Sequence, residues 1–320
     1  MSLVRSALRL LVTTALATGC AVEAPEDDAE VAGESAFSAA NLVYEGQVRG
    51  NTLPDRTLHL TFDDGPGTRT TELAEYLATQ GIHATFFING VNVDGRQRAV
   101  DAIVGRGHTL ANHTQSHQLL PTLPSERVLR EIAETDAIIQ AAQPGGHHYL
   151  RAPYAGWTES LQRTLTGSEQ AAYLVPIHWD IGTRTTSASA ADWDCWSKGI
   201  SVERCGDLYM AEIRSKGRGI VLVHDIHGRT VDMTKYIVPK LLAEGFTFAA
   251  LSEVPSVQTI LAAPRATQKA DECFSGSLVR RVTIGTCVQS THDAKWYRCA
   301  TGDWTKSSAT DGACAERHAF

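Results

Sequence analysis

The chain has 320 residues, of which 43% are hydrophobic and 20% are charged, and its formal net charge is −7. This length suffices for one large domain and one small domain, each with a hydrophobic core. The negative balance comes without a basic stripe, which argues against nucleic acid as a partner.

The N-terminal segment has the pattern of a secretory signal. Two arginines precede a short apolar stretch, residues 10–17, which is too short to span a membrane as a stable helix. Gly19-Cys20 resembles the cleavage box of bacterial lipoproteins, in which the cysteine becomes the lipidated first residue, although Ala17 stands where leucine is commonest. We therefore expect a signal peptide over residues 1–19 and a lipid on Cys20 that holds the protein at a bacterial cell envelope. Ordinary secretion is the alternative, and the lipid is the only membrane contact expected.

The middle of the chain predicts an α/β domain. Residues 20–40 are rich in Ala, Glu, Asp and Ser, which indicates a disordered tether. From residue 41 to residue 261, strand-like and helix-like segments alternate, which predicts a parallel sheet with helices outside it. Seven strands indicate a barrel-like arrangement rather than an open sheet. The strands are expected over 58–62, 85–88, 109–111, 149–152, 173–179, 220–224 and 246–251, and the helices over 71–79, 99–105, 125–142, 208–215 and 233–243.

The cysteines indicate disulfides. Apart from Cys20, six remain, an even number that suits an exported chain. Cys195 and Cys205 lie close in sequence. The other four crowd residues 271–320, which we expect to form a small cysteine-rich accessory domain, and they allow three pairings: Cys273, Cys287, Cys299 and Cys314. Their spacing lacks the CxxC pairs of a structural zinc site. Three aromatic residues of this domain fit either a platform for sugar rings or its core: Trp296, Tyr297 and Trp304.

Polar side chains follow the predicted strands at their carboxyl ends, the face that carries the active site in a parallel barrel. They are Asp63, Asp64, His113, Arg151, Asp180, His224 and Asp225. Other histidines fit structural or loop positions better than a site: His108, His147, His148 and His227.

Two adjacent carboxylates, Asp63 and Asp64, end the first strand, and Gly65-Pro66 then breaks it. Two carboxylates in one pocket repel each other, so a cation or a shared proton usually accompanies them. Taken alone, the pair fits a surface turn better than a pocket. The residues downstream favour the pocket.

His113 and His117 are four residues apart, so on a helical turn their imidazoles share one face. Two histidines and one carboxylate form a common catalytic zinc set, with one position left for water. Two surface histidines are the alternative to this metal site. The acid pair at a neighbouring strand end favours the metal site.

Arg151 and His224 also stand at the carboxyl ends of predicted strands. A buried arginine can pair bidentately with a carboxylate and hold it ionised, whereas a surface ion pair contributes only about 0–1 kcal/mol. A histidine at a strand end can titrate near neutral pH and give a proton, unless it is a satisfied core residue.

These stretches in this order, with Asp192-Trp193 before the last, resemble the polysaccharide deacetylase family over about residues 55–255. The family is also called the NodB-homology family or carbohydrate esterase family four. The resemblance implies a distorted (β/α) barrel and one divalent metal ion, most often Zn²⁺, with Co²⁺ or another divalent ion possible. It also implies an enzyme that hydrolyses the linear amides of acetylated sugar polymers.

Residue by residue, the resemblance implies the following roles. Asp63 is the general base and Arg151 orients it. The metal ligands are Asp64, His113 and His117. The backbone N–H of Tyr154 helps to hold the oxyanion, and His224 is the general acid, supported by Asp192. Leu222 and Trp193 shape the acetyl pocket.

The Asp-Trp pair departs from the family pattern, because it follows Asp180 by about twelve residues instead of a few. Two acids therefore compete to support His224: Asp180 at a strand end, and Asp192 before Trp193. The dipeptide context favours Asp192. A disulfide between Cys195 and Cys205 would fix this loop and remove about 2.5–3 kcal/mol of unfolded-chain entropy.

The expected activity is metal-dependent removal of acetyl groups from an N-acetylated polysaccharide such as peptidoglycan, chitin or a related glycan, by a monomer. The alternatives are an esterase for O-acetylated xylan with the same site, and a non-catalytic sugar-binding lipoprotein on the same scaffold. The complete set of acids and histidines argues against the non-catalytic alternative.

Overall fold

A computed structural model describes residues 48–262, except 167, 174–175 and 184–189, and the segments 272–275, 280–283, 285–289, 296–300 and 303–307. The expected signal peptide, the tether and the lipidated Cys20 lie outside the described residues, so they stay predictions. Within the described part of the chain, no helix has the length and apolar character needed to cross a membrane.

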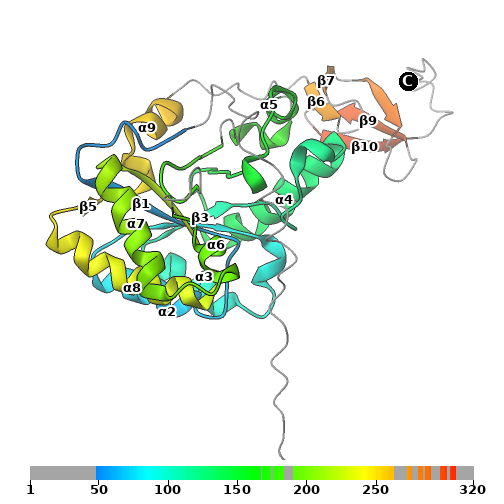
Figure 1. The fold of residues 1–320 in the computed structure, drawn as a ribbon. Helices are drawn as coiled ribbons and strands as arrows, with labels where there is room; N and C mark the ends of the chain where they lie inside the picture. Colours follow the sequence, from blue (N-terminus) through cyan, green and yellow to red (C-terminus); the bar gives the residue numbers. More distant parts are fainter. Residues whose placement is uncertain are drawn as a thin grey trace, which may run out of the picture.

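A parallel sheet forms the centre of the protein (Figure 1). Its middle strand, β1 (Thr57–Asp63), is buried along its whole length, because its apolar residues Leu58, Leu60 and Phe62 and the alternate polar ones all face packed layers. β4 (Gly219–His224) pairs with one side of β1, and β2 (Thr85–Ile88) pairs with the other side. β3 (Thr109–Asn112) pairs with β2, and the short β5 (Thr247–Phe248) pairs with the start of β1.

The register of this sheet aligns the carboxyl ends of its central strands. Asp63 of β1 lies opposite Phe87 of β2 and opposite His224 of β4. Because parallel strands in register end at the same edge, the side chains that follow them meet there. The sequence order of the polar residues therefore becomes a spatial cluster.

The predicted α/β architecture with a parallel sheet and outer helices is confirmed, and five of the predicted strands are present. The segments expected as strands over 149–152 and 173–179 contribute only isolated parallel bridges, Asn112 with Leu150 and Leu150 with Pro176. A further bridge joins Ile181 to Val221 of β4. Closure of the sheet into a barrel stays a prediction.

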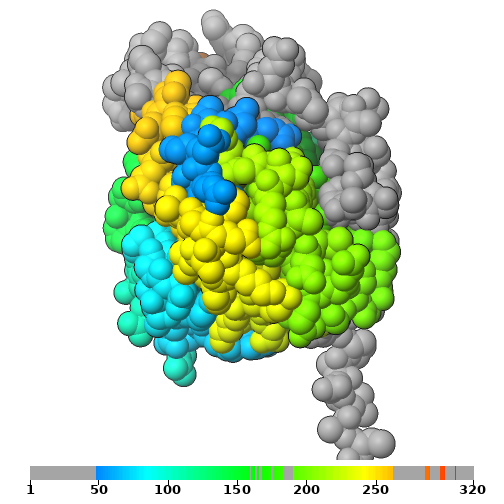
Figure 2. All heavy atoms as spheres, turned by 60° about the vertical axis from the view of Figure 1, so that its left-hand side comes forward, coloured from blue at the N-terminus to red at the C-terminus, as the bar shows by residue number. Residues whose placement is uncertain are grey.

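Helices cover the sheet because each has one buried apolar face. α8 (Gly228–Ala243) lies between α2 (Thr70–Thr79) and α7 (Val202–Lys216) on the outer surface, where it is yellow in Figure 2. α7 begins earlier than expected because Ser201 caps it, with its hydroxyl accepting a hydrogen bond from the N–H of Arg204 at 3.2 Å. The remaining α-helices are α3 (Gln97–Gly105), α4 (Ser125–Ala142), α5 (Glu159–Thr166), α6 (Asp192–Ser197) and α9 (Pro255–Ala262).

The described C-terminal strands pair only with one another. β6 (Glu272–Ser275) and β7 (Arg280–Thr283) form one antiparallel pair, and a second antiparallel sheet contains β8 (Cys287–Gln289), β9 (Trp296–Ala300) and β10 (Asp303–Ser307). Cys287 and Cys299 are buried and disulfide-bonded, whereas Cys314 lies outside the described residues, as do the side chains of Cys273 and Trp304. The pairing of the four cysteines, the role of the aromatic residues and the boundaries of both domains stay predictions.

A buried histidine in β1 makes the stability of this sheet depend on pH. His59 is fully buried, donates from Nδ1 to the carbonyl of Ala249 at 2.8 Å, and accepts at Nε2 from the hydroxyl of Thr85 at 3.0 Å. Burial lowers the pKa of His59 to about 4, helped by the positive charge of Arg151. The neutral ring fits both partners.

We therefore predict that the free energy of unfolding decreases as the pH falls from about 6.5 to about 4. In this range His59 is protonated in the unfolded state but stays neutral in the folded state. The contribution of His59 to this decrease is about 3 kcal/mol. Denaturant unfolding of the metal-free parent and of His59→Gln over this pH range measures it. A slope in the variant as steep as in the parent would contradict the assignment.

Candidate active site

Three potential metal ligands converge at the carboxyl edge of the sheet. Oδ1 of Asp64 lies 3.2 Å from Nε2 of His113 and 3.2 Å from Nε2 of His117. All three donor atoms lie within 4.8 Å of one another. The carboxylate oxygen is buried, and no described donor reaches it with hydrogen-bond geometry. A buried oxygen faced by two imidazole nitrogens suits a divalent cation, so the residues present fit the metal that the sequence predicts.

The local backbone turns each ligand toward this point. Asp64 has a left-handed conformation, with φ of 67°, which ends the alternation of β1 and lets Asp63 and Asp64 address the same edge. His113 follows β3 and donates from Nδ1 to the carbonyl of Arg151 at 2.8 Å, which leaves Nε2 as the ligand atom.

The expectation that His113 and His117 share a helical turn is wrong. Residues 113–117 form an irregular loop, in which Thr114 and His117 have φ of 71° and 53°. The two rings nevertheless approach to 4.9 Å between centroids. The irregular loop thus produces the proximity of the two rings that a helical turn was expected to give.

The two histidines keep Asp64 ionised. Burial by itself raises the pKa of the Asp64 carboxyl, but the charge on His117 and the contact with His113 outweigh it and lower that pKa well below the usual range. An anionic ligand at this position favours binding of a cation.

Asp63, the other member of the acid pair, contacts Arg151. Nη1 of Arg151 donates to Oδ1 of Asp63 at 2.6 Å and to the hydroxyl of Thr61 at 2.8 Å. The bidentate pair anticipated from the sequence is wrong, because the remaining N–H groups go to the carbonyls of Ile177 and His178. Oδ2 of Asp63 therefore remains directed toward the metal ligands, 3.6 Å from Nε2 of His113.

The Arg151 side chain is almost fully buried, and its guanidinium lies over the ring of Phe87, 4.2 Å from the centroid. Burial lowers the pKa of Arg151, and the Asp63 carboxylate acts in the opposite direction. A buried ion pair of this kind contributes little net stability by itself.

Asp192 contacts His224, and Asp180 does not. Nδ1 of His224 donates to Oδ1 of Asp192 at 2.8 Å, and the backbone N–H of His224 donates to Oδ2 at 2.8 Å. The hydroxyl of Thr230 also donates to Oδ2, at 2.7 Å. Burial raises the pKa of Asp192, but the charge on His224 outweighs it, so the pKa is lowered overall.

Asp180 lies at the opposite end of β4. Its Oδ2 accepts hydrogen bonds from the N–H groups of Gly50 and Ile220, at 2.7 Å and 2.8 Å. Asp180 thus binds the backbone where β4 begins, so its expected place among the residues at the carboxyl edge is wrong.

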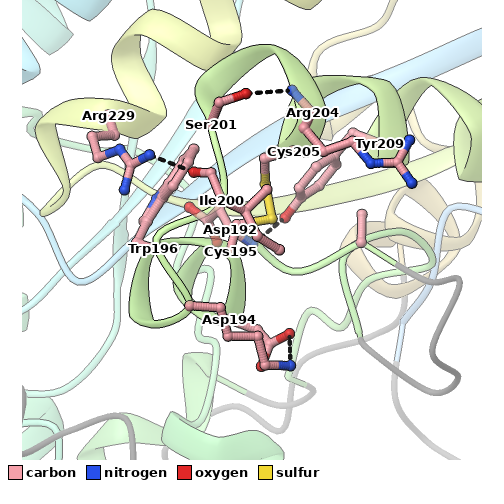
Figure 3. The surroundings of a disulfide bond; sticks show 12 residues. Asp192, Asp194, Cys195, Trp196, Ile200, Ser201, Arg204, Cys205, Tyr209 and Arg229 are labelled. Carbon is pink, nitrogen blue, oxygen red and sulfur yellow. Dashed lines mark hydrogen bonds and ion pairs between the residues drawn. A yellow bond between two sulfur atoms is a disulfide. The ribbon is translucent and has the colours of Figure 1, made fainter.

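A disulfide joins the helix that carries Asp192 to its neighbour (Figure 3). The predicted bond between Cys195 of α6 and Cys205 of α7 is confirmed. The hydroxyl of Tyr209 accepts from the N–H of Asp192 at 3.0 Å and donates to the carbonyl of Leu222 at 2.9 Å. α6 is therefore fixed both to α7 and to β4.

The remaining predicted residues surround this cluster. Leu222 is buried two residues before His224, so both side chains point to the same face of β4. Tyr154 has φ of 56°, and its ring lies 4.6 Å from that of His117. Trp193 is half-buried beside Asp192 in α6.

Sequence reasoning assigned no role to Asp225, although it is 1% exposed and follows His224 directly. Burial raises the pKa of Asp225 to about 7, with a contribution from the charge of Asp64. The hydroxyl of Thr70 donates to its carboxylate. A Cβ on Gly65 would lie 2.3 Å from that carboxylate, so glycine is required in the turn after the acid pair, which was the available signal.

Two asparagines that hold the ligand loops were also missed. Nδ2 of Asn92 donates to the carbonyl of Asp64, and Nδ2 of Asn89 donates to the carbonyl of His113, both at 2.7 Å. Asparagines in loops are common, and nothing in their spacing distinguishes these two.

This cluster of acids and histidines at the carboxyl edge of an α/β sheet suits a metal-dependent hydrolase. A model of the family described as polysaccharide deacetylase matches residues 50–172. The chitooligosaccharide deacetylase of Rhizobium leguminosarum bv. trifolii is 31% identical over 216 residues, which cover 62% of this chain and 92% of that protein. The chain belongs to the polysaccharide deacetylase family, which confirms the resemblance of its motifs.

Two other deacetylases are also similar to this chain. Chitin deacetylase 1 of Cryptococcus neoformans var. grubii is 30% identical, over 60% of this chain and 42% of that protein. The peptidoglycan-N-acetylmuramic acid deacetylase PdaC of Bacillus subtilis is 28% identical, over 63% of this chain and 39% of its own length. The solved structure of PdaC shares the fold, with a TM-score of 0.52 at 24% identity over 65% of this chain and 93% of that one.

We predict that one divalent metal ion binds per chain, and that His113→Ala loses it, because two ligands hold a catalytic metal poorly. Elemental analysis after dialysis against Zn²⁺ measures the stoichiometry. His147→Ala is the matched control, since His147 is exposed and outside the cluster. Equal metal content in His113→Ala and the parent would contradict the site.

Proposed function

We propose that this protein removes acetyl groups from an N-acetylated glycan of the chitin or peptidoglycan type, with one divalent metal ion, most often Zn²⁺, held by Asp64, His113 and His117. One observation carries the proposal: the possible metal ligands lie in the same cluster as two groups that can transfer protons. Asp63 accepts a hydrogen bond from Arg151, and His224 donates one to Asp192. The names of the relatives, which act on chitooligosaccharide, chitin and peptidoglycan, supply the substrate class.

When bound, the metal supplies a Lewis acid that makes water more acidic and polarises the acetyl carbonyl. The chain's own residues then handle the protons. Asp63 is the general base: Arg151 occupies its Oδ1 and leaves Oδ2, on the side of the metal ligands, to accept a proton from the attacking water.

A hydrogen-bond donor of the protein must stabilise the negative charge that develops on the carbonyl oxygen. We assign this role to the backbone N–H of Tyr154. Tyr154 has a left-handed backbone conformation, and its ring lies beside that of His117. Removing such a donor typically costs about 3 kcal/mol of transition-state stabilisation.

His224 is the general acid. Its Nδ1–H donates to Asp192, whose carboxylate stabilises the doubly protonated ring, and in that ring Nε2–H supplies the proton that goes to the departing amine. An amine is a poor leaving group unless it is protonated, which makes this step essential for an amide substrate. Leu222, on the same face of β4, and Trp193 line the space for the acetyl methyl group.

The deciding experiment measures acetate release from N-acetylchitooligomers and from acetylated xylan, each with and without a chelator. We expect release from the chitooligomers that chelation abolishes and Zn²⁺ restores. Release from xylan alone would support the O-acetyl esterase instead. Binding of the oligomers without any release would support a non-catalytic sugar-binding protein.

We predict that Asp192→Asn decreases turnover strongly and moves the alkaline limb of the pH–rate profile to lower pH. The charge on His224 lowers the pKa of Asp192, and because the attraction is mutual, the carboxylate stabilises the protonated ring. This stabilisation is lost in the variant, so the ring gives up its proton at lower pH.

The matched control is Asp180→Asn, since Asp180 accepts from the backbone N–H groups of Gly50 and Ile220, away from His224. Steady-state rates from pH 5 to pH 10 separate the two variants. A larger loss and a limb shift in Asp180→Asn, with Asp192→Asn like the parent, would show that Asp192 does not support the acid.

A further inference from the structure

His117 is the ligand whose position depends most on a loop. Asp64 and His113 directly follow strands, whereas His117 lies five residues beyond the end of β3. Thr114 and His117 both adopt left-handed backbone conformations, which are unfavourable for a residue with a Cβ. Such a conformation persists only where surrounding groups hold it.

Glu131 of α4 supplies the strongest hold on this loop. Its Oε2 accepts the backbone N–H of Ser116 at 2.7 Å, and its Oε1 accepts the hydroxyl of Ser116 at 2.7 Å. Ser116 directly precedes His117. Both oxygens of the Glu131 carboxylate therefore bind Ser116, the residue next to the third potential metal ligand, His117.

The environment of Glu131 is unusual for a glutamate in the middle of a helix. The residue is 0% exposed, and its only cationic partner in the described structure is Arg127, which donates to Oε1 at 2.7 Å from a side chain that is 43% exposed. Burying a carboxylate is costly unless hydrogen bonds satisfy it. An apolar residue would fill this helix face at lower cost, so stability alone does not account for a carboxylate there.

Other contacts hold the earlier part of the loop. The hydroxyl of Thr135, one turn further along α4, donates to the side chain of Gln115 at 3.1 Å. The N–H of Val91 donates to the carbonyl of Gln115 at 3.0 Å, and the N–H of Gly90 donates to that of Thr114 at 3.2 Å. At Ser116 itself, Glu131 accepts the backbone N–H and the hydroxyl, and the side chain of Gln118 donates to the carbonyl at 3.4 Å.

We propose that Glu131 is a positioning residue for the metal site: through Ser116 it fixes the loop so that Nε2 of His117 faces Asp64 and His113. This inference rests on the proposed metal site. Groups that orient metal ligands through a second contact typically contribute 10- to 100-fold to metal affinity.

The test measures the Kd for Zn²⁺ of the full-length protein by competition with a chromophoric chelator. Glu131→Gln keeps the size of the side chain, but its amide NH₂ faces a donor that the carboxylate accepted. We expect the Kd to increase by about 10- to 100-fold. Glu126→Gln is the matched control, because Glu126 lies on the same helix and pairs with Arg130 in a half-exposed position. This control removes the same charge and is expected to leave the Kd unchanged.

Ser116→Ala tests the same contact without altering the charge. It removes the hydroxyl and keeps the backbone N–H, so we expect a smaller increase in Kd than for Glu131→Gln. Ser116→Ala also tests the proposal if Glu131→Gln does not fold. The absorption spectrum of the Co²⁺-substituted protein reports ligand geometry, which general destabilisation would not change, and we expect it to differ from the parent in both variants.

The outcomes separate this inference from the proposed function. A parent that binds no metal would overturn the metal site itself. A parent that binds Zn²⁺, with Glu131→Gln and Ser116→Ala binding it equally well and giving parental Co²⁺ spectra, would overturn the role of Glu131 alone. An equal loss in Glu126→Gln would assign the effect to charge rather than position.

Discussion

The parallel pairing of β1 with β4 is the constraint on which the site depends. The register sets Asp63 opposite His224, so the proposed general base and the proposed general acid start from neighbouring backbone positions. A slip of one residue would turn His224 to the other face of the sheet and separate it from the acid pair. The buried apolar residues of both strands prevent that slip, because each face packs against its own layer. The hydrophobic core and the catalytic geometry are thus specified by the same residues.

Concentrated negative charge is the second feature of this edge. Asp63, Asp64, Asp192 and Asp225 are all buried within one region. Each has a different partner: Arg151, the histidine pair, His224 and the Thr70 hydroxyl. Four carboxylates cannot share an interior without such separate compensation. The separate partners place the four acids in different electrostatic surroundings.

The sequence predicted the parallel sheet and the acids and histidines at its edge, because both follow from local patterns. It also favoured Asp192 over Asp180, since the tryptophan after Asp192 carried information that strand position did not. Two inferences went wrong because they assumed regular geometry. The loop of His113 and His117 is not a helical turn, and Asp180 caps the beginning of β4. The role of Glu131 could not be predicted, because the sequence of an amphipathic helix does not distinguish a buried glutamate from an exposed one. Only the contact with Ser116 in the folded chain makes the difference visible.

The cross-link between Cys195 and Cys205 makes α6 independent of the segment before it. Asp192 is held by α7 through the disulfide and Tyr209, and by β4 and α8 through His224 and Thr230. None of these attachments runs through the residues that connect Asp180 to Asp192. Loop-closure entropy grows only slowly with length, so that connection can be lengthened or shortened at small energetic cost. A change in the length of that connection would therefore leave the hydrogen bond between Asp192 and His224 in place.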